Sequence, residues 1–362
     1  LGSSFAFIGS MNAAFAGAVS VQAGFAGLLI GAILAGLVYA IIAIVVKKAG
    51  VSWIDKLMPP VVIGPTVAII GLSLASSAIG NLSKSDVTGG TTNFAVLCGL
   101  VALIATTLAS TYGKKYTKMI PFIIGILSGY ALAAVLTLIG NATGVESLMI
   151  SDFSAFTNLA SGGVTLSTFF SVPDFTFLTA AKGFSQVDAE YIGTVAVAYI
   201  PVAFVVFAEH IADHKNISSI IEKDLLKDPG LDRTLLGDGI GSIVGAFFGG
   251  CPNTTYGESV ACVAITKNAS VATIITAAIE CIILAFISPI VAFISSIPSC
   301  VMGGVCMALY GFIAVSGLKM VQKVDLEQNK NLFVVSSILI AGIGGLQLSF
   351  GKITITSIAC AL

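Results

Sequence analysis

The chain alternates long apolar runs with short polar segments. A helix of about 20 residues crosses a hydrocarbon core of roughly 30 Å. Runs of about this length cover residues 22–46, 60–80, 93–112, 119–140, 190–212, 234–250, 271–296, 300–318 and 331–346. Shorter apolar pieces at residues 1–19, 252–266 and 353–362 predict half-spans. The pattern therefore predicts an all-α polytopic membrane protein.

Composition supports this prediction, because 56% of the residues are hydrophobic, 10% are charged, and the mean hydropathy is +1.03. So few charged residues cannot cover a soluble core of this size. The formal net charge of −1 argues against a nucleic-acid partner. The seven cysteines show no paired spacing, so neither a disulfide framework nor a metal site is expected.

Basic residues indicate the orientation of the chain. Most of the 17 lysines and arginines fall in every second loop, if residues 1–19 and 252–266 each count as one crossing. By the positive-inside rule these loops face the cytoplasm. The long segment at about 142–188 then lies outside and joins two halves of the molecule.

One apolar stretch is interrupted by polar residues, because residues 251–260 read CPNTTYGESV. Pro252 lacks a backbone donor, and the threonines and tyrosine that follow favour an extended conformation, with a helix beginning near Gly257. Residues 3–7 (SSFAF) resemble residues 254–258 (TTYGE), and the crossing count relates the two pieces by inversion. Broken segments at corresponding places of two halves indicate a transporter's substrate site. The alternative is a loop at the membrane surface.

Acidic residues near the predicted spans are the second sign of a functional cavity. Glu209 follows an apolar run without a nearby base. An acid inside the membrane is costly, so such acids usually line a functional cavity. On a helix, Glu209 and Asp213 share a face, and His210 and His214 form a neighbouring pair that could instead bond to backbone carbonyls. Asp238 favours a structural role as a helix cap or a hydrogen-bond partner. Glu280 lies near the middle of a predicted span. Two interpretations of its role stay open, a proton site and a partner for a neighbouring helix.

These strings carry a resemblance. LGSSFAF, KKAG, AEHI, KDLLKDPGL, PNTTYGE, AIT and VMGGV resemble the uracil-transporting bacterial members of the nucleobase/ascorbate transporter (nucleobase:cation symporter) family, over nearly all of the chain. The resemblance implies fourteen membrane segments in two inverted sevenfold repeats, with two short antiparallel strands in broken segments. By that pattern this chain is a fragment without the first two segments and most of the last. The implied division is a core domain (1–50 and 189–297), a gate domain (51–150 and 298–362) and an extracytoplasmic linker (151–188).

Site residues follow from the same resemblance. Glu209 and Glu258 are expected to accept hydrogen bonds from the ring N–H groups of uracil. Backbone N–H groups near Phe5 and Gly257 are expected to meet its carbonyl oxygens, and the rings of Phe5 and Tyr256 border the pocket. Glu209, with Asp213 and His214, is expected to couple transport to protons.

The chain departs from the family pattern at three places. Asp213 stands where a histidine is expected, and His214 comes one residue later, so the family's proton-relay histidine has no exact counterpart here. Ser259 and Ala261 replace an expected Asn and Gly, so base selectivity could differ. Glu280 replaces an apolar residue.

The function expected from these observations is proton-coupled import of uracil across the bacterial plasma membrane by alternating access. The alternatives are a xanthine or other purine permease of the same family and, with less support, an anion exchanger of similar architecture. No catalytic set is evident, so we expect neither an enzyme nor a cofactor or metal, with the proton as coupling ion. Besides uracil, the lipid bilayer is a partner, and a homodimer is left open.

Overall fold

The computed structural model describes residues 2–51, 53, 56, 59–114, 116–350 and 353–355. These residues form two compact units. Unit 1 comprises Leu1–Ser73, Asp174–Ala264 and Ile313–Leu362, and unit 2 comprises Leu74–Pro173 and Ile265–Phe312. Each unit is therefore assembled from stretches that lie far apart in the sequence.

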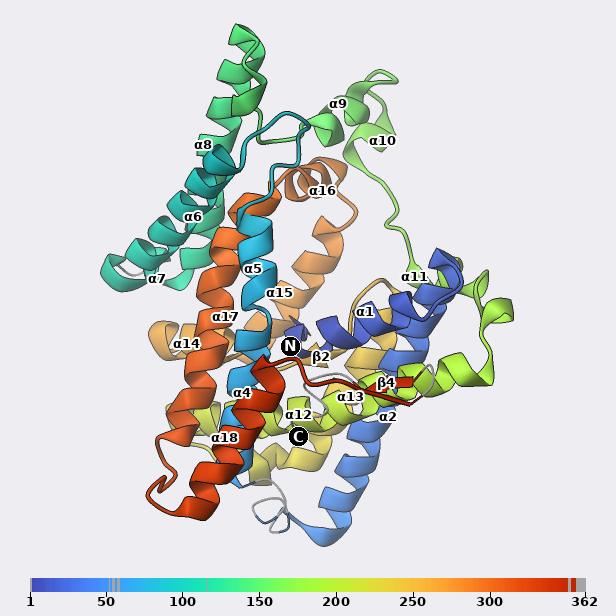
Figure 1. Ribbon diagram of the computed structural model, residues 1–362, viewed down its shortest axis with the longest axis vertical. Coiled ribbons are helices and arrows are strands. Elements are labelled where there is room, and N and C mark those ends of the chain that lie inside the picture. The colour runs from blue at the N-terminus through green and yellow to red at the C-terminus, as the bar shows by residue number, and fades with distance from the viewer. Residues whose placement is uncertain are drawn as a thin grey trace. The chain divides into compact units, whose positions relative to one another are not determined.

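Unit 1 contains most of the polar interruptions predicted from the sequence. Its elements, labelled in Figure 1 where there is room, are β1 (Gly2–Ser3), η1 (Phe5–Phe7), α1 (Ile8–Ala16), α2 (Val21–Ala49), α4 (Pro60–Ser73), α11 (Thr176–Ala181), η3 (Phe184–Gln186), α12 (Ala189–Ile221), η4 (Leu226–Gly230), α13 (Leu231–Phe247), β2 (Asn253–Thr254), most of α14 (Gly257–Thr266), the end of α17 (Ser299–Val321), α18 (Asn329–Ile343), β3 (Leu348–Phe350) and β4 (Ile353–Ile355).

Unit 2 is built from helices, apart from one isolated β-bridge, in its described residues. They are α5 (Ala75–Leu82), α6 (Thr92–Tyr112), α7 (Tyr116–Met119), α8 (Pro121–Thr143), η2 (Glu146–Leu148), α9 (Ser154–Ala160), α10 (Leu166–Phe169), α15 (Val271–Leu284), α16 (Ser288–Ser295) and the first part of α17. Helices α6 and α8 pack against each other along much of their length.

Membrane-length helices are present where the apolar runs predict them. Six helices in the described part of the chain are long and apolar enough to cross a membrane: Val21–Ala49, Pro60–Leu82, Thr92–Tyr112, Pro121–Thr143, Ala189–Ile221 and Ser299–Val321. Helix ends agree with local chemistry. The Ser20 hydroxyl accepts a hydrogen bond from the Ala23 N–H at 3.1 Å, and the Asp188 carboxylate accepts one from the Tyr191 N–H at 2.7 Å. The prediction of a polytopic helical protein is confirmed.

The predicted single span at 271–296 is wrong, because the structure divides it into α15 and α16. Pro289 lies in the first turn of α16, where its ring and its missing N–H do not fit the interior of a continuous helix from α15 but suit a helix start. The interruption is held by neighbours: Ile287 forms a β-bridge with Phe170, and the Ser288 hydroxyl donates to the Ser167 carbonyl at 3.2 Å. Apolar length alone concealed this break.

The tail also differs from the prediction of a half-span at 353–362. Strand β4 pairs antiparallel with β3, with Phe350 opposite Ile353, so residues 353–355 are extended rather than helical. Residues 356–362 lie outside the described part of the chain. The predicted external segment at about 142–188 contains short helices, of which α11 packs against α2 in unit 1.

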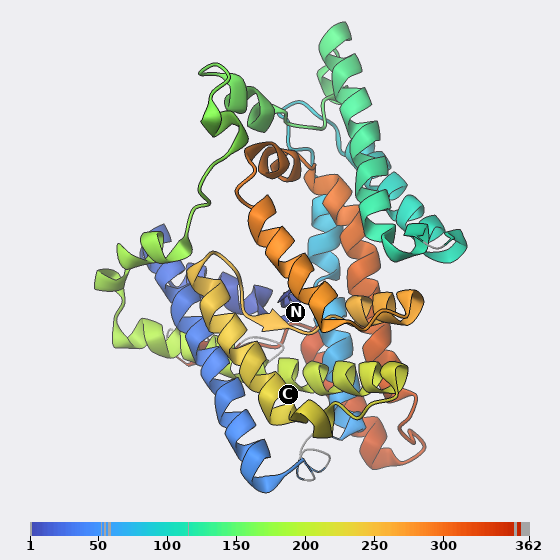
Figure 2. The same ribbon diagram turned by 180° about the vertical axis from the view of Figure 1, so that it is seen from behind.

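The core of unit 1 is formed by α2, α12 and α13. Helices α2 and α13 run side by side (Figure 2), because Gly36 and Gly239 face each other without side chains between them. A Cβ atom added to Gly36 would lie 2.7 Å from the Gly239 carbonyl oxygen. Helix α12 packs on the same helix, where Tyr199 is fully buried against Gly31. Small residues thus permit the close helix contacts that are typical of membrane proteins.

Candidate functional site

Two strands from distant parts of the sequence pair in unit 1. Strand β1 runs antiparallel to β2, with Gly2 opposite Thr254 and Ser3 opposite Asn253. The Ser4 N–H donates to the Pro252 carbonyl at 2.9 Å and extends the pairing. Both Figures 1 and 2 place the N-terminus beside β2. The predicted pairing of two short antiparallel strands is confirmed.

A helix begins after each strand. Downstream of β1, η1 and α1 begin at Phe5 and Ile8, and the Ser4 hydroxyl accepts a hydrogen bond from the Ala6 N–H at 3.3 Å. Downstream of β2, α14 begins at Gly257, as predicted. A helix start presents N–H groups without intrahelical partners and the positive end of the helix dipole. The strand pair therefore brings together two such starts from the two halves of the sequence.

Glu209 on α12 is joined directly to this strand pair. The buried Thr254 hydroxyl donates to Glu209 Oε2 at 3.1 Å. Glu209 itself is half-buried. Sequence reasoning assigned Thr254 only an extended conformation and missed its contact with Glu209. The chain offered one signal, a hydroxyl residue at the point where the strand interrupts an apolar segment.

Tyr256 and Asp213 complete the contacts around β2. The Tyr256 hydroxyl donates to the Ser3 carbonyl at 2.6 Å, which ties the two strands together through a side chain. Asp213 is buried on α12, and a Cβ atom added to Gly257 would lie 3.5 Å from its Oδ1 atom. The structure thus places Glu209, Asp213, Tyr256 and Gly257 around the same strand, and their roles in binding and proton coupling stay predictions.

Phe5 and Glu258 also belong to the predicted site. Phe5 is the first residue of η1 and is half-buried, and its neighbour Phe7 stacks on Tyr199 with ring centroids 5.5 Å apart. The backbone of Glu258 belongs to the first turn of α14, whereas its side chain lies outside the described part of the structure. Its role as a uracil ligand stays a prediction.

His214 is engaged within its own helix. Its Nδ1 atom donates to the His210 carbonyl at 2.8 Å, and its ring stacks on that of His210 with centroids 4.1 Å apart. This geometry corresponds to the alternative in which the imidazole bonds to a backbone carbonyl. A relay role for His214 stays a prediction.

His210 and Asp238 form a buried pair between α12 and α13. His210 Nδ1 lies 3.2 Å from Asp238 Oδ2, and Nε2 lies 3.1 Å from the Thr234 hydroxyl. Asp238 is fully buried and His210 is 1% exposed. The prediction that Asp238 bonds to a neighbour is confirmed. Its partner was missed, because the two residues are 28 positions apart and nothing in the local pattern connects them.

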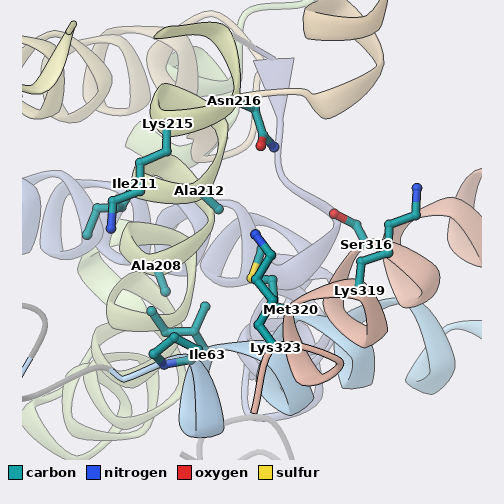
Figure 3. A pocket seen from close by; sticks show the side chains of 11 residues that line it. Ile63, Ala208, Ile211, Ala212, Lys215, Asn216, Ser316, Lys319, Met320 and Lys323 are labelled. Carbon is teal, nitrogen blue, oxygen red and sulfur yellow. The ribbon is translucent and has the colours of Figure 1, made fainter. Parts of the chain in front are cut away.

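Unit 1 also contains a cavity of about 370 Å³ beside the Glu209 helix (Figure 3). Ala208 and Ala212 of α12 contribute to its wall, and the basic residues Lys215, Lys319 and Lys323 also line it. The other lining residues are Pro60, Ile63, Ile211, Asn216, Ser316 and Met320. Across the described residues, no group of three His, Cys, Asp or Glu side chains gathers as a metal site.

Comparison with known proteins connects this geometry to a family. Residues 1–349 match a family model for xanthine/uracil permeases, which is described as Permease family. The chain is 38% identical to a uracil permease from Bacillus caldolyticus over 348 residues, which cover 95% of this chain and 73% of that protein. It is 36% identical to a uracil permease from Bacillus subtilis (strain 168) over 368 residues, covering 100% and 78% of the two chains.

A third relative extends the match to another bacterial group. The chain is 34% identical to a uracil permease from Escherichia coli (strain K12) over 364 residues, covering 100% of this chain and 76% of that protein. Such matches confirm the resemblance drawn from the sequence strings. The chain therefore belongs to the xanthine/uracil permease family and is a multi-pass membrane transporter rather than an enzyme.

Proposed function

We propose that the protein imports uracil together with protons by alternating access. The observation that supports this best is the contact between Glu209 and Thr254, which places a half-buried carboxylate beside two paired strands and two helix starts. The relatives at 34–38% identity are uracil permeases, which favours the same substrate class here.

The chemistry of uracil fits such a site. Uracil is a flat, neutral ring with two N–H donors and two carbonyl acceptors. The carboxylates of Glu209 and Glu258 would accept from its ring N–H groups, and backbone N–H groups near Phe5 and Gly257 would donate to its carbonyls. The rings of Phe5 and Tyr256 would border its faces. Each polar atom of the substrate would then have a partner, as burial away from water requires.

Proton coupling is assigned to Glu209, with Asp213 and His214 as its neighbours on α12. An acid in a membrane span is costly and is typical of proton pathways in transporters. One charge moved through 100 mV corresponds to about 2.3 kcal/mol, or roughly fifty-fold accumulation of a neutral substrate. A single coupled proton would therefore suffice for concentrative uptake.

An inverted-repeat architecture forms part of the proposal. The two strand–helix units at residues 2–16 and 253–266 have the same order of elements and meet through their strands. In transporters built this way, broken segments from the two repeats form the substrate site. The division into core and gate domains stays a prediction.

Ligand-induced thermal stabilisation of the full-length protein tests the substrate. Uracil at a hundred times its Kd should stabilise the fold by about 2.7 kcal/mol, whereas xanthine and ascorbate at equal concentration should not. Stronger stabilisation by xanthine than by uracil would contradict the proposal. It would indicate that departures from the family pattern, such as Ser259, have changed the base selectivity. Competition of radiolabelled uracil uptake by the same bases gives an independent measurement.

Uptake into proteoliposomes tests the coupling. Radiolabelled uracil should accumulate under an inward proton gradient and should equilibrate without accumulation when a protonophore is added. The Glu209→Gln variant should lose accumulation. If Glu209→Gln accumulates uracil with the pH profile of the wild type, Glu209 is not the coupling acid.

A further inference from the structure

Three polar residues of α13 recur every fourth position. Thr234, Asp238 and Ser242 therefore share one face of the helix. Asp238 and Ser242 are fully buried, and Thr234 is half-buried. Buried polar side chains in a membrane protein are costly unless their partners are well placed, so the partners of this row are informative.

The three side chains of the row hydrogen-bond to His210 and Asn253, which are the sequence neighbours of Glu209 and Thr254. Thr234 and Asp238 hold the two ring nitrogens of His210, at 3.1 and 3.2 Å, and His210 adjoins Glu209. The Ser242 hydroxyl accepts a hydrogen bond from the Asn253 N–H at 2.8 Å, and Asn253 adjoins Thr254. The Glu209–Thr254 bond at 3.1 Å then closes a ring of contacts from α13 through α12 and β2.

We propose that the row of Thr234, Asp238 and Ser242 is a positioning device that fixes the Glu209 carboxylate relative to strand β2 and thereby sets the affinity for the substrate. This inference rests on the proposed function and deepens it. Thr234, Asp238 and Ser242 act through His210 and Asn253, and Glu209 and the strand amides are the groups that would contact uracil.

The arrangement is suited to positioning because it fixes rotation as well as distance. Bonds at both nitrogens prevent the His210 ring from turning, so α12 keeps one rotational setting against α13. Binding sites need their polar groups within roughly 0.5 Å of the productive geometry. The three contacts made by Thr234, Asp238 and Ser242 supply that restraint without touching the substrate.

The role requires a hydrogen-bonding group at position 238, not a charge. The Thr234 hydroxyl donates to the Leu231 carbonyl at 3.2 Å, so it can accept from His210 Nε2–H, and an amide N–H at position 238 can then donate to Nδ1 of the neutral imidazole. In the other tautomer the amide oxygen accepts from Nδ1–H, as a carboxylate does. Asp238→Asn therefore keeps the restraint, whereas Asp238→Ala removes it. The pair of variants separates positioning from a need for the charge itself.

The experiment measures the Kd for uracil and the melting temperature without ligand for full-length variants. We expect Asp238→Ala to weaken binding by about tenfold or more, Asp238→Asn to stay within about threefold of the wild type, and Ser242→Ala to lie between them. The matched control is Thr137→Ala in unit 2, which removes buried hydrogen bonds far along the chain from the row. It should lower the melting temperature and leave the Kd unchanged.

Two results would overturn the inference. One is a Kd for Asp238→Asn as weak as that for Asp238→Ala, and the other is wild-type binding by both Asp238→Ala and Ser242→Ala. If Asp238→Ala does not fold, Ser242→Ala alone decides, since a wild-type Kd for it contradicts the role of the row. Failure of the wild type to bind uracil is a separate result, which rejects the proposed substrate. The same ratios are then measured with the base that the wild type does bind.

Discussion

The spanning helices of the two units differ in how much of their apolar surface they bury. In unit 1, the most apolar windows of α2 and α12 are 56% and 61% buried. In unit 2, the corresponding windows of α6 and α8 are 33% and 22% buried. Unit 1 thus surrounds its helices with protein, whereas α6 and α8 leave faces of Leu, Ile and Val that suit contact with lipid tails.

The buried polar groups differ in the same direction. Among the described residues, unit 1 buries the ionisable side chains of His210, Asp213 and Asp238, while the buried polar side chains of unit 2 are hydroxyls, such as those of Thr106 and Thr137. A hydroxyl can bond to a carbonyl of its own helix, but a carboxylate at membrane depth needs partners from other elements. Dense packing and buried charge therefore occur together in the unit that contains the candidate site.

The largest expected effect is a loss of uracil affinity that occurs on substitution of a glutamate in unit 1 but not of one in unit 2. Glu209→Ala should weaken uracil binding by about a thousandfold, or about 4 kcal/mol, because it removes a carboxylate whose partner groups stay buried. Glu280→Ala, on an exposed position of α15, should bind uracil as the wild type does. Equilibrium binding of radiolabelled uracil measures both. Equal losses in the two variants would remove the functional difference between the units.

Thr137 tests whether a hydroxyl of unit 2 serves stability alone. Its Oγ1 atom accepts from the N–H groups of Ile150 and Ser151, each at 2.9 Å. Thr137→Val should lower the free energy of unfolding by about 2–3 kcal/mol, because two buried donors lose their partner. Denaturation in detergent measures this loss. A change in uracil Kd beyond about twofold would show that unit 2 contributes to binding.

Glycine substitutions give a smaller effect and compare the packing of the units. A Cβ atom on Gly304 of α17 would collide with the Gly99 carbonyl of α6, and backbone cannot move aside easily. A Cβ atom on Gly24 of α2 would collide with the ring of Phe15, which is 38% exposed and can swing outward. Gly304→Ala should therefore cost about 2 kcal/mol and Gly24→Ala less than about 0.5 kcal/mol. The melting temperatures of the two variants provide the check, and the reverse order would contradict this reasoning.

The smallest effect concerns the polar connection between α12 and α13. Lys223 Nζ lies 2.9 Å from Asp228 Oδ2, and this hydrogen bond and charge lower the pKa of the Asp228 carboxyl. The contribution to stability is present above the ordinary aspartate range and is lost as pH falls through the lowered pKa. Because both side chains are largely exposed, the effect should be small and salt-sensitive. Asp228→Asn should match the wild-type melting temperature at pH 7; a drop of several degrees would contradict this.

Much of the architecture followed from the sequence because bilayer thickness imposes a minimum length on each span. That constraint located both ends of the helix at Val21–Ala49 within three residues and the start of the helix at Ala189–Ile221 within one, although the second helix continues nine residues beyond its predicted end. Proline and β-favouring residues likewise predicted strand β2 and the helix start at Gly257. Where a run was long enough to span but contained Ser288 and Pro289, apolar length outweighed the proline signal and the break was missed.

The candidate site was predictable only as a set of residue types. Glu209, Asp213, Tyr256 and Gly257 lie around strand β2, whereas their binding and coupling roles stay predictions. The contacts that hold them were not predictable, because the bonds from Asp238 to His210 and from Ser242 to Asn253 join different elements. Hydrophobic periodicity reports which face of a helix is apolar, whereas tertiary partners depend on how helices are rotated against one another.

The pairing of β1 with β2 also has a consequence for biosynthesis. Tyr256 and the Ser3 carbonyl that it binds are 253 residues apart. At roughly 5–20 residues per second, a ribosome needs about 13–50 s to make the chain between them. Throughout that interval the amides of β1 have no strand to pair with, and unpaired backbone is not tolerated in contact with lipid. The first residues of the site must therefore stay in water or against other protein until the last ones emerge, so a ribosome that stalls before Asn253 would leave an exposed strand for cellular quality control to recognise.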